Sequence, residues 1–314
     1  MTQSGSVSAP AQPQAVKVVF VLLLFIAVPA FLTLHTVKVP STPEFPAGVE
    51  TSPYGYTVSL LLWIVPIVGF GYWLIPKEHL KIPRRAFWIT ALLTFGIGVM
   101  LDFLFAQYFF EFPNAGATLR IKAPALGAPV PIEEYIFYIT GAIVVLLLYI
   151  WFDESFLSAY HSGTGIPGKL LQFHWPSVVT GLVLIAAAYV YKNFFTDSPG
   201  FPGYFTFLTL LAIVPSAGFL RAASPLINWR AFSATLFFVV LVSLLWEATL
   251  GVPYGWWAYE PNAMVGIFVR AWSNLPIEAV LLWGAATFTS VILFTVIKAW
   301  VASDRTLKGA FLGK

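Results

Sequence analysis

The sequence predicts an all-α membrane protein with about eight transmembrane helices, built as two repeats of the same orientation. Of its 314 residues, 59% are hydrophobic and only 10% are charged, a composition that soluble domains do not have. The apolar residues gather into runs of about 20, the length that crosses a bilayer. Short sequences also recur at a fixed spacing of 145 residues, which predicts an internal repeat.

The hydrophobic runs predict the membrane spans in chain order. The eight expected spans are 16–36, 54–76, 86–109, 131–152, 175–195, 203–221, 230–250 and 275–300. The first run is too long for the core of a signal peptide and is followed by no convincing cleavage site, so we interpret it as a span.

These spans divide the chain into five segments. The small, polar residues 1–15 predict a disordered tail. The first membrane repeat is expected at 16–152, a connecting loop at 153–174, the second repeat at 175–300 and a cytoplasmic tail at 301–314. Of the lysines and arginines outside or at the ends of spans, 12 lie on the side of the termini and 5 on the other. The positive-inside rule therefore predicts a multi-pass cell-membrane protein with both termini in the cytoplasm.

The recurring sequences relate the two halves of the chain. The pairs are RAF at 85–87 and 230–232, and PIE at 131–133 and 276–278. The same spacing relates Asp102 to Glu247. Because each half has four spans, the halves share one orientation, and their pseudo-twofold axis is expected along the membrane normal.

Acidic side chains within or at the mouths of the spans are the candidate catalytic residues. They are Asp102, Glu133, Glu134, Glu247 and Glu278. An ionisable group in lipid is costly and marks a functional site by default. We expect Asp102 to approach Glu133, and Glu247 to approach Glu278, in one cavity of the outer half of the membrane. Two carboxyls that are close in a low dielectric do not ionise together easily, so one keeps its proton.

A structural role is the alternative for the acids of the PIE motifs. Proline followed by glutamate is typical of a helix N-terminus, where the carboxylate meets free N–H groups and the positive end of the dipole. This role is favoured for Glu134, whose counterpart in the second half is Ala279. It accounts less well for Glu133 and Glu278, because the preceding helix of each half carries a deeper acid. Acids preserved only to hold helices together remain a further alternative.

Aromatic residues accumulate close to these acids. The candidate substrate-binding residues are Trp246, Tyr254, Trp256, Trp257, Tyr108, Phe109 and Trp272. Tryptophan and tyrosine belts at the membrane interface need no further function. Aromatic faces around a buried acid, however, are also what a carbocation requires, since ring quadrupoles attract positive charge and water is excluded.

Several other functional classes find no support in the sequence. The chain has no cysteine, and its four histidines lack metal-ligand spacing, so we expect no metal site. GFGYW and GIGVM lack the full glycine fingerprint and a preceding strand, so we expect no nucleotide or flavin cofactor. Every lysine lies at a span end or in a loop, unlike the Schiff-base lysine of a retinal protein. FDES at 152–155 stands alone, whereas prenyltransferases pair such motifs. Nothing suggests nucleic acid, and protein partners stay open.

The motifs PIEE at 131–134 and PIEA at 276–279 resemble those of the small, cofactor-free integral-membrane lycopene cyclases. These occur as two-subunit bacterial enzymes, as fused two-repeat proteins and as domains of fungal bifunctional enzymes. In each half the motif opens a helix after an acid-bearing helix and an aromatic loop. The resemblance covers roughly 54–152 and 203–300.

The resemblance implies an isomerase with an apolar isoprenoid substrate, held among membrane lipids. An acid protonates the terminal double bond of a linear polyene, the cation closes a six-membered ring, and a base removes a proton. The match to the family motif assigns proton transfer to Glu133 and Glu278, with Asp102 and Glu247 as partners. Two features depart from the family pattern: Ala279, so the two halves need not be equally active, and the extra spans near 16–36 and 175–195. Related membrane terpene cyclases use similar acid-initiated chemistry on other isoprenoids, so the resemblance supports "isoprenoid cyclase" better than "lycopene".

Two alternatives to a carotenoid cyclase remain at this point. One is a cyclase of another terpenoid. The other is a proton-coupled transporter or lipid-binding membrane protein, since repeats and buried carboxylates occur there as well. Against transport, the acids gather toward one face of the membrane instead of forming a path across it.

Overall fold

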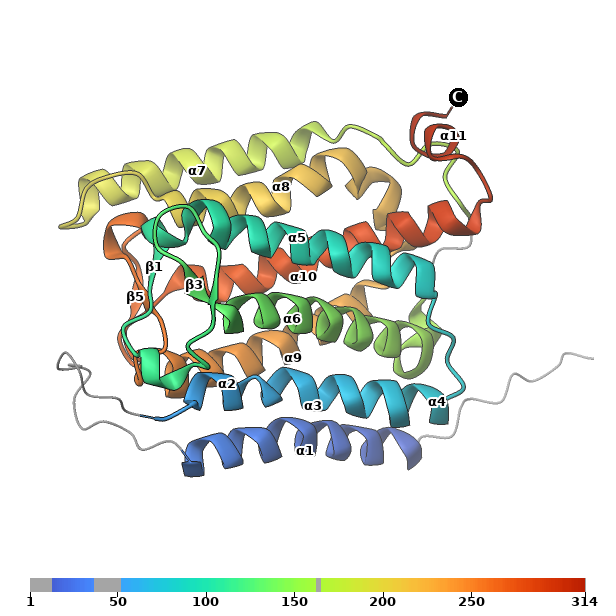
Figure 1. Ribbon diagram of the computed structural model, residues 1–314. Coiled ribbons are helices and arrows are strands. Elements are labelled where there is room, and N and C mark those ends of the chain that lie inside the picture. Colours follow the sequence, from blue (N-terminus) through green and yellow to red (C-terminus); the bar gives the residue numbers. More distant parts are fainter. Residues whose placement is uncertain (1–12, 37–51, 162–164, 314) are drawn as a thin grey trace, which may run out of the picture.

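In the computed structural model, which describes residues 13–36, 52–161 and 165–313, long helices run side by side in one bundle (Figure 1). Seven helical stretches of the described residues are long and apolar enough to cross a membrane. They are Gly55–Lys77, Arg84–Phe109, Ile132–Phe156, Trp175–Phe195, Gly203–Leu226, Trp229–Gly251 and Ile277–Ala302. Seven such helices are the pattern of a multi-pass membrane protein, and they agree with seven of the expected spans to within about five residues at each end.

Some stretches are composed of several elements. The first half contains α1 (Pro13–Thr36), α2 (Gly55–Ser59), α3 (Leu61–Gly69), the π-helical turn η1 (Phe70–Leu74), α4 (Ile75–Lys77), α5 (Arg84–Phe109), α6 (Ile132–Trp151), η3 (Phe152–Phe156) and η4 (Ser158–Tyr160). The second half contains α7 (Trp175–Phe195), α8 (Gly203–Ala223), η5 (Ser224–Leu226), α9 (Trp229–Trp246), η6 (Glu247–Gly251), α10 (Ile277–Ala302) and α11 (Leu307–Leu312).

The two chain ends differ in detail from the expectation. Helix α1 begins at Pro13, inside the segment 1–15 that was expected to be disordered, and residues 1–12 lie outside the described residues. The expected cytoplasmic tail contains α11, whose backbone accepts hydrogen bonds from Leu170 and Leu171. These contacts arise because the tail folds back on the connecting loop, which hydropathy does not report.

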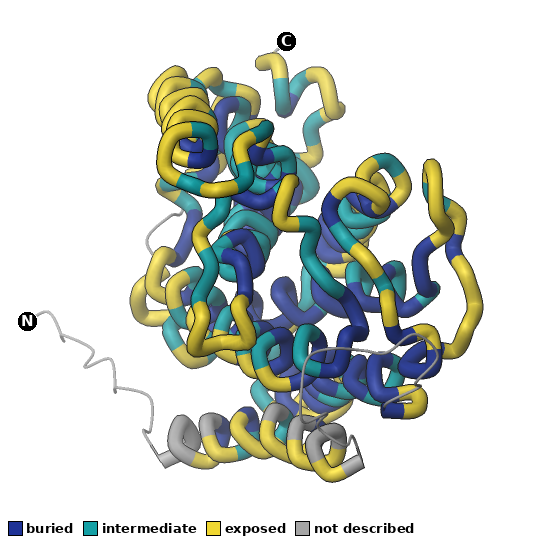
Figure 2. Tube along the Cα trace, turned by 90° about the vertical axis from the view of Figure 1, so that its left-hand side faces the viewer, coloured by how far each residue is buried: buried dark blue, intermediate teal, exposed yellow. Residues whose placement is uncertain are grey.

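The helices differ widely in how far they are buried. Helix α10 packs against α5, α6, α8 and α9 and occupies the middle of the bundle. In the most apolar window of each span, 72% of residues are buried for Ile132–Phe156 but only 17% for Trp175–Phe195. In Figure 2 the buried residues lie toward the inside of the bundle and the exposed residues lie on its outside. Buried polar groups lie on the central helices α6 and α10 and also on the inner faces of α5, α9 and η6, where Asp102, Ser243 and Glu247 are buried.

Short strand pairs connect the helices at one end of the bundle. They are β1 (Phe110–Glu111) with β4 (Ala258–Tyr259), β2 (Lys122–Ala123) with β3 (Val130–Pro131), and β5 (Phe268–Val269) with β6 (Leu275–Pro276). The 3₁₀ turns η2 (Ala115–Ala117) and η7 (Pro261–Ala263) lie in the same segments. We call this the loop end; it lies opposite α4 and α11 (Figure 1).

The PIE motifs place their glutamates where the central helices begin. Pro131 and Pro276 are extended, with φ/ψ of −60°/142° and −70°/149°, and each ends a strand pair. A helix starts at the next residue, so the glutamates fall in its first turn. All five candidate acids therefore belong to the loop end of the bundle.

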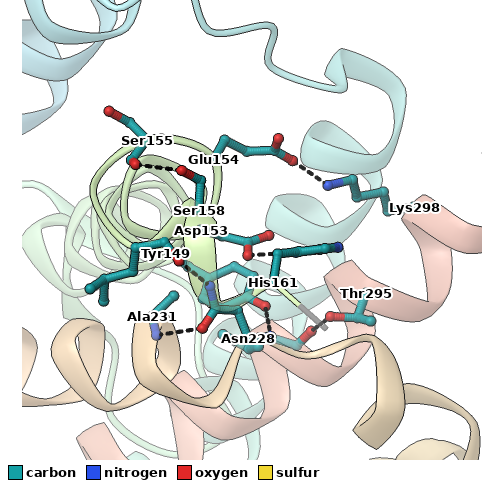
Figure 3. A network of polar contacts seen from close by, with 12 residues as sticks. Tyr149, Asp153, Glu154, Ser155, Ser158, His161, Asn228, Ala231, Thr295 and Lys298 are labelled. Carbon is teal, nitrogen blue, oxygen red and sulfur yellow. Dashed lines mark hydrogen bonds and ion pairs between the residues drawn. The ribbon is translucent and has the colours of Figure 1, made fainter. Parts of the chain in front are cut away.

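The opposite end is held by a separate network of polar contacts (Figure 3). His161 pairs with Asp153 at 2.8 Å, and Lys298 pairs with Glu154 at 2.5 Å. The Asn228 backbone N–H donates to the Tyr149 hydroxyl at 3.3 Å. These contacts join η3 and the neighbouring loop to α9 and α10, so they clamp the end of the bundle that is remote from the five acids.

Candidate active site

Two of the five acids line one cavity at the loop end. Glu134 from α6 and Glu247 from η6 share it with ten further residues, most of them aromatic, and its space, with the part that is open to the outside included, is about 380 Å³. We call it the acid cavity. Glu134 is 7% exposed and Glu247 2% exposed, so both carboxyls lie in surroundings of low polarity. The two ion pairs between described residues lie at the other end of the bundle, and neither includes these acids.

Glu134 is held by one hydroxyl group from a distant segment. The Tyr56 hydroxyl, on α2, donates to Glu134 Oε1 at 2.6 Å. Tyr56 is 1% exposed and packs against the Trp257 ring, with centroids 5.2 Å apart. Glu134 lies in the first turn of α6, and its carboxyl also points into the acid cavity. The helix-end role expected for Glu134 stays a prediction, beside this second environment.

Glu247 accepts hydrogen bonds on both carboxylate oxygens. Trp283 Nε1 donates to Oε1 at 3.1 Å, and the Tyr259 hydroxyl donates to Oε2. Burial, together with the neighbouring Glu247 carboxylate, raises the pKa of Tyr259 well above its ordinary value. Tyr259 therefore remains a donor at neutral pH. Glu247 opens a π-helical turn, η6, a local feature that often marks functional sites.

Asp102 lies one side chain away from the acid cavity. It is fully buried, and its Oδ1 accepts a hydrogen bond of 3.0 Å from the Tyr138 hydroxyl, which lines the cavity. Its Oδ2 has no hydrogen-bond partner. Asp102 is therefore connected to the cavity only by its hydrogen bond with Tyr138, whereas the sequence predicted that it approaches Glu133.

Glu133 and Glu278 bind backbone N–H groups of the loops and do not line the acid cavity. Glu133 Oε1 accepts hydrogen bonds of 2.6 Å from the Leu119 N–H and from the Thr57 hydroxyl. Glu278 Oε1 accepts one of 2.5 Å from the Val265 N–H. Both side chains are fully buried. The sequence expected these two to face the cavity; instead each fastens the loop that precedes its own helix.

Aromatic rings surround the acid cavity, as the sequence predicted, although only part of the expected set lines it. Trp246 and Trp257 line the cavity with centroids 4.7 Å apart. Tyr254 and Trp256 are fully buried but lie outside the lining, and the Trp256 ring stacks on Tyr56 at 6.1 Å. These two therefore support the cavity without reaching it.

The other predicted aromatics lie elsewhere. Tyr108 and Trp272 are 60% and 43% exposed, so they belong to the outer surface. Phe109 is buried against Tyr204, with centroids 5.3 Å apart. Tyr108 and Phe109 belong to the last turn of α5, and Trp272 lies in the turn between β5 and β6. None of the three lines the acid cavity, although all are near the acids in sequence.

Sequence reasoning missed several cavity side chains, some close in sequence to Glu134 or Glu247 and others, Tyr56 and Tyr204, from remote segments. They are Tyr56, Phe137, Tyr138, Tyr204 and Tyr259. One signal was present: Tyr138 and Trp283 are 145 residues apart, like the acids to which they donate. A second was the Gly-Tyr pair that begins α2 and α8.

The two long loops cover the acid cavity by pairing with each other. Strand β1 pairs with β4, and the Asn114 N–H donates to the Gly255 carbonyl at 3.0 Å. The Glu260 N–H donates to the Phe109 carbonyl at 3.0 Å. This pairing joins one loop from each half, so the cover depends on both halves.

Replacing Gly251 is expected to displace one ring of the cavity. A Cβ added at Gly251 lies 2.2 Å from Trp257 Cη2 and Cζ2. Overpacking of this kind costs about 1–3 kcal/mol, so Gly251→Ala should lower the thermal midpoint and any activity of the cavity. Heating the purified protein in detergent, followed by size-exclusion chromatography, measures the midpoint. Gly284→Ala is the matched control, because its Cβ meets no atom within 4 Å. Equal midpoints for Gly251→Ala and the wild type would contradict this packing.

The carboxyls of Glu111 and Glu260 give the loop cover a pH dependence. Burial and the hydrogen bond with Glu111 raise the pKa of Glu260 above its ordinary value of 4.5. The folded state therefore holds a proton more tightly than the unfolded state, and stability falls as pH rises from 4.5 to the raised pKa. We expect Glu260→Gln to remove this fall, by at most about 0.5 kcal/mol because the site is partly exposed. Unfolding midpoints of both proteins over a pH series test this prediction. If Glu260→Gln were more stable than the wild type below pH 4.5 and lost that difference at higher pH, the direction of the predicted pH dependence would be contradicted.

Comparisons with family models, with curated proteins and with solved structures found no match. The described residues contain no group of three or more His, Asp or Glu side chains placed to hold a metal ion. The site itself consists of two buried carboxyls that differ in their hydrogen bonding and face one cavity among aromatic rings.

Proposed function

We propose that the protein is a membrane-embedded isoprenoid cyclase that closes a ring on a linear carotenoid, with lycopene as the first candidate. The observation that carries the proposal is the acid cavity, in which Glu134 and Glu247 face one space enclosed by aromatic side chains. The PIEE and PIEA motifs, which resemble those of membrane lycopene cyclases, support the same assignment.

Glu134 is proposed as the proton donor, in place of Glu133 and Glu278. It lies on the cavity lining, accepts a single hydrogen bond from Tyr56, and has no cationic partner among the described ion pairs. A protonated carboxyl in an apolar site is a general acid of the kind that protonates an alkene. Its proton adds to the terminal double bond and leaves a tertiary cation.

Glu247 is proposed as the base that ends the reaction. Donors reach both of its oxygens, from Trp283 and Tyr259, an arrangement suited to a carboxylate that bears negative charge. After ring closure Glu247 removes one proton, which restores a neutral alkene. One proton is added and one is lost, so the product is an isomer of the substrate.

The rings of the cavity are proposed to protect the cation between these steps. Trp246, Trp257 and Phe137 line the cavity together, and the Phe137 and Trp246 centroids are 5.0 Å apart. Aromatic faces attract a cation, and an enclosed apolar site keeps water from trapping it. The paired loops above the cavity serve this exclusion.

We further infer that the bundle comprises two repeats of the same orientation with eight spans, α1 being the eighth. Helix α1 packs on α3 as α7 packs on α8, and α3 packs on α6 as α8 packs on α10. In this arrangement α5 corresponds to α9, and α6 to α10. The contacts between the halves are equivalent in the same way, because α6 packs on α9 and α10 packs on α5. The positive-inside pattern then supports cytoplasmic termini, with the acid cavity toward the outer face.

Side-chain contacts support the same relation. Tyr138 donates to Asp102 as Trp283 donates to Glu247, and each member lies 145 residues from its counterpart. The backbone contacts of Glu133 and Glu278 form a second such pair, to amides 14 and 13 residues earlier in the chain.

Pigment analysis tests the proposal. Cells that accumulate lycopene and express the protein should contain a cyclic carotenoid, detected by chromatography and absent from cells with an empty vector. Unchanged lycopene at a verified level of membrane-inserted protein would remove the carotenoid assignment. Linear isoprenoids of other lengths would then be tested, followed by proton-coupled flux in vesicles.

A further inference from the structure

A second cavity adjoins the acid cavity within the bundle. It lies between α5, α6, α8 and α10, and its space, with the part that is open to the outside included, is about 600 Å³. Its lining includes Ile97, Leu101, Val145, Leu211 and Ala286 and contains no charged side chain. We call it the apolar chamber. A space of this composition favours a hydrocarbon over water or a polar ligand.

The apolar chamber and the acid cavity share part of their lining. Phe137, Tyr138 and Leu282 belong to both. Trp283 also lines the chamber, and its Nε1 donates to Glu247 of the acid cavity. The chamber and the acid cavity are therefore neighbouring spaces, and these shared side chains stand between the chamber and the two carboxyls.

The chamber also adjoins the outside of the bundle. An open groove runs between the loop end of α5 and the start of α8, lined by Phe105, Tyr108, Gly203 and others, and it shares Phe207 with the chamber. The Phe105 and Phe207 rings are 6.1 Å apart. Phe105 and Leu210 are 36% and 44% exposed, so the apolar side of this groove opens where lipid is expected around the spans. Gln107, Glu260 and Asn262 line its other side, toward the loops.

We propose that the apolar chamber holds the unreacted hydrocarbon chain of a linear isoprenoid, which enters from the membrane past Phe207 and places its terminal double bond in the acid cavity. The inference rests on the proposed function. It adds an orientation: the far end of the substrate remains in the chamber or the groove while one end reacts. A two-ended polyene is therefore released or turned before its second end is cyclised.

Gly141 offers a graded way to fill the chamber. A Cβ at Gly141 meets only the Trp283 ring, at 3.7 and 3.8 Å, so a small side chain fits and a larger one extends into the chamber. Gly284, on α10, is the matched control, because a Cβ there meets no atom within 4 Å. The series is Gly141→Ala, Gly141→Val and Gly141→Phe, each beside the same change at Gly284.

The measurement is the quenching of tryptophan fluorescence by lycopene, with purified protein in lipid nanodiscs. Trp246, Trp257 and Trp283 line the two cavities and report on a bound polyene. We expect saturable quenching in the wild type and a progressive rise of the half-saturation concentration along the Gly141 series. For Gly141→Phe the half-saturation concentration should rise roughly tenfold or more. This is the loss of affinity expected when two methylene-sized groups of the polyene no longer fit in the chamber. The Gly284 series should stay within about twofold.

The outcomes separate this inference from the proposed reaction. If Gly141→Phe binds lycopene as tightly as the wild type, the chamber does not hold the hydrocarbon chain, even if cyclic product forms. If lycopene binding falls along the Gly141 series but the wild type forms no cyclic product, the chamber is supported as the binding site and the proposed cyclase reaction is contradicted. Saturable quenching by the fatty acid cis-parinaric acid but none by lycopene assigns the chamber to a lipid acyl chain and overturns the proposal. If Gly141→Phe fails to fold, Gly141→Val and Ala286→Leu, on the facing helix, carry the same test.

Discussion

Glu134→Gln and Glu247→Gln should each abolish ring formation while leaving the protein in the membrane. Glutamine keeps the size of the side chain and an oxygen that accepts the hydrogen bonds from Tyr56 or Trp283. It neither donates a proton to an alkene nor removes one from a cation. The loss of a general acid or base costs about 10²- to 10⁴-fold in rate. Chromatography of cyclic product, normalised to the protein in the membrane fraction, measures it.

The partner side chains supply graded controls for this experiment. Tyr259→Phe removes one donor to Glu247 and leaves the carboxyl in place, so we expect a smaller loss than for Glu247→Gln. Asp102→Asn acts on the cavity only through Tyr138 and should be intermediate. Wild-type activity in Glu134→Gln or Glu247→Gln would show that the carboxyl concerned carries no step of the reaction.

Replacing Glu133 or Glu278 by alanine should have its largest effect on folding. Each fully buried carboxyl accepts a backbone N–H from a loop, and alanine leaves that N–H buried without its partner. An unsatisfied buried donor costs about 1–3 kcal/mol. Glu133 also accepts from the Thr57 hydroxyl, so Glu133→Ala should be the more damaging of the two. The yield of monodisperse protein and its thermal midpoint in detergent measure the effect.

Glutamine at the same two positions is the informative control. Glu133→Gln and Glu278→Gln retain an acceptor oxygen, so we expect them to keep the fold and most of the activity. This pattern is the reverse of that at Glu134 and Glu247, where glutamine preserves folding and removes activity. If Glu133→Gln or Glu278→Gln folded normally but formed no ring, proton transfer would return to the glutamates that the family motif first indicated.

The spans were predictable because hydropathy acts locally. A run of about 20 apolar residues satisfies its backbone hydrogen bonds within its own helix, whatever surrounds it. Seven predicted stretches accordingly agree with helices of the structure. The loops were not predictable, since their strands pair over long separations, Phe110 with Tyr259 among them.

The choice between Glu133 and Glu134 lay beyond the sequence for a geometric reason. Neighbouring residues on an α-helix point about 100° apart, at 3.6 residues per turn. Which of the two enters the cavity depends on the rotation of α6 about its axis, and packing against α3, α5 and α10 sets that rotation. The presence of Ala279 at the corresponding position of the other motif favoured Glu133, whereas in the structure Glu134 lines the cavity together with Glu247.

The hydrogen-bond partners were hidden for a similar reason. Tyr56 lies 78 residues before Glu134, and Trp283 lies 36 residues after Glu247. Only tertiary packing brings such groups together. The spacing of 145 residues was the one sequence signal that reached across this distance, and it pointed to Asp102, Glu247 and their donors alike.

The most direct test of the account is the incubation of lycopene with purified wild-type protein in D₂O, followed by mass spectrometry of the pigments. Proton transfer from an exchangeable carboxyl places one solvent-derived hydrogen on the polyene for each ring formed, and the final deprotonation removes a different one. The account predicts a cyclic product heavier by one deuterium per ring, with recovered lycopene unlabelled. A cyclic product without deuterium, or unchanged lycopene alone, would contradict it.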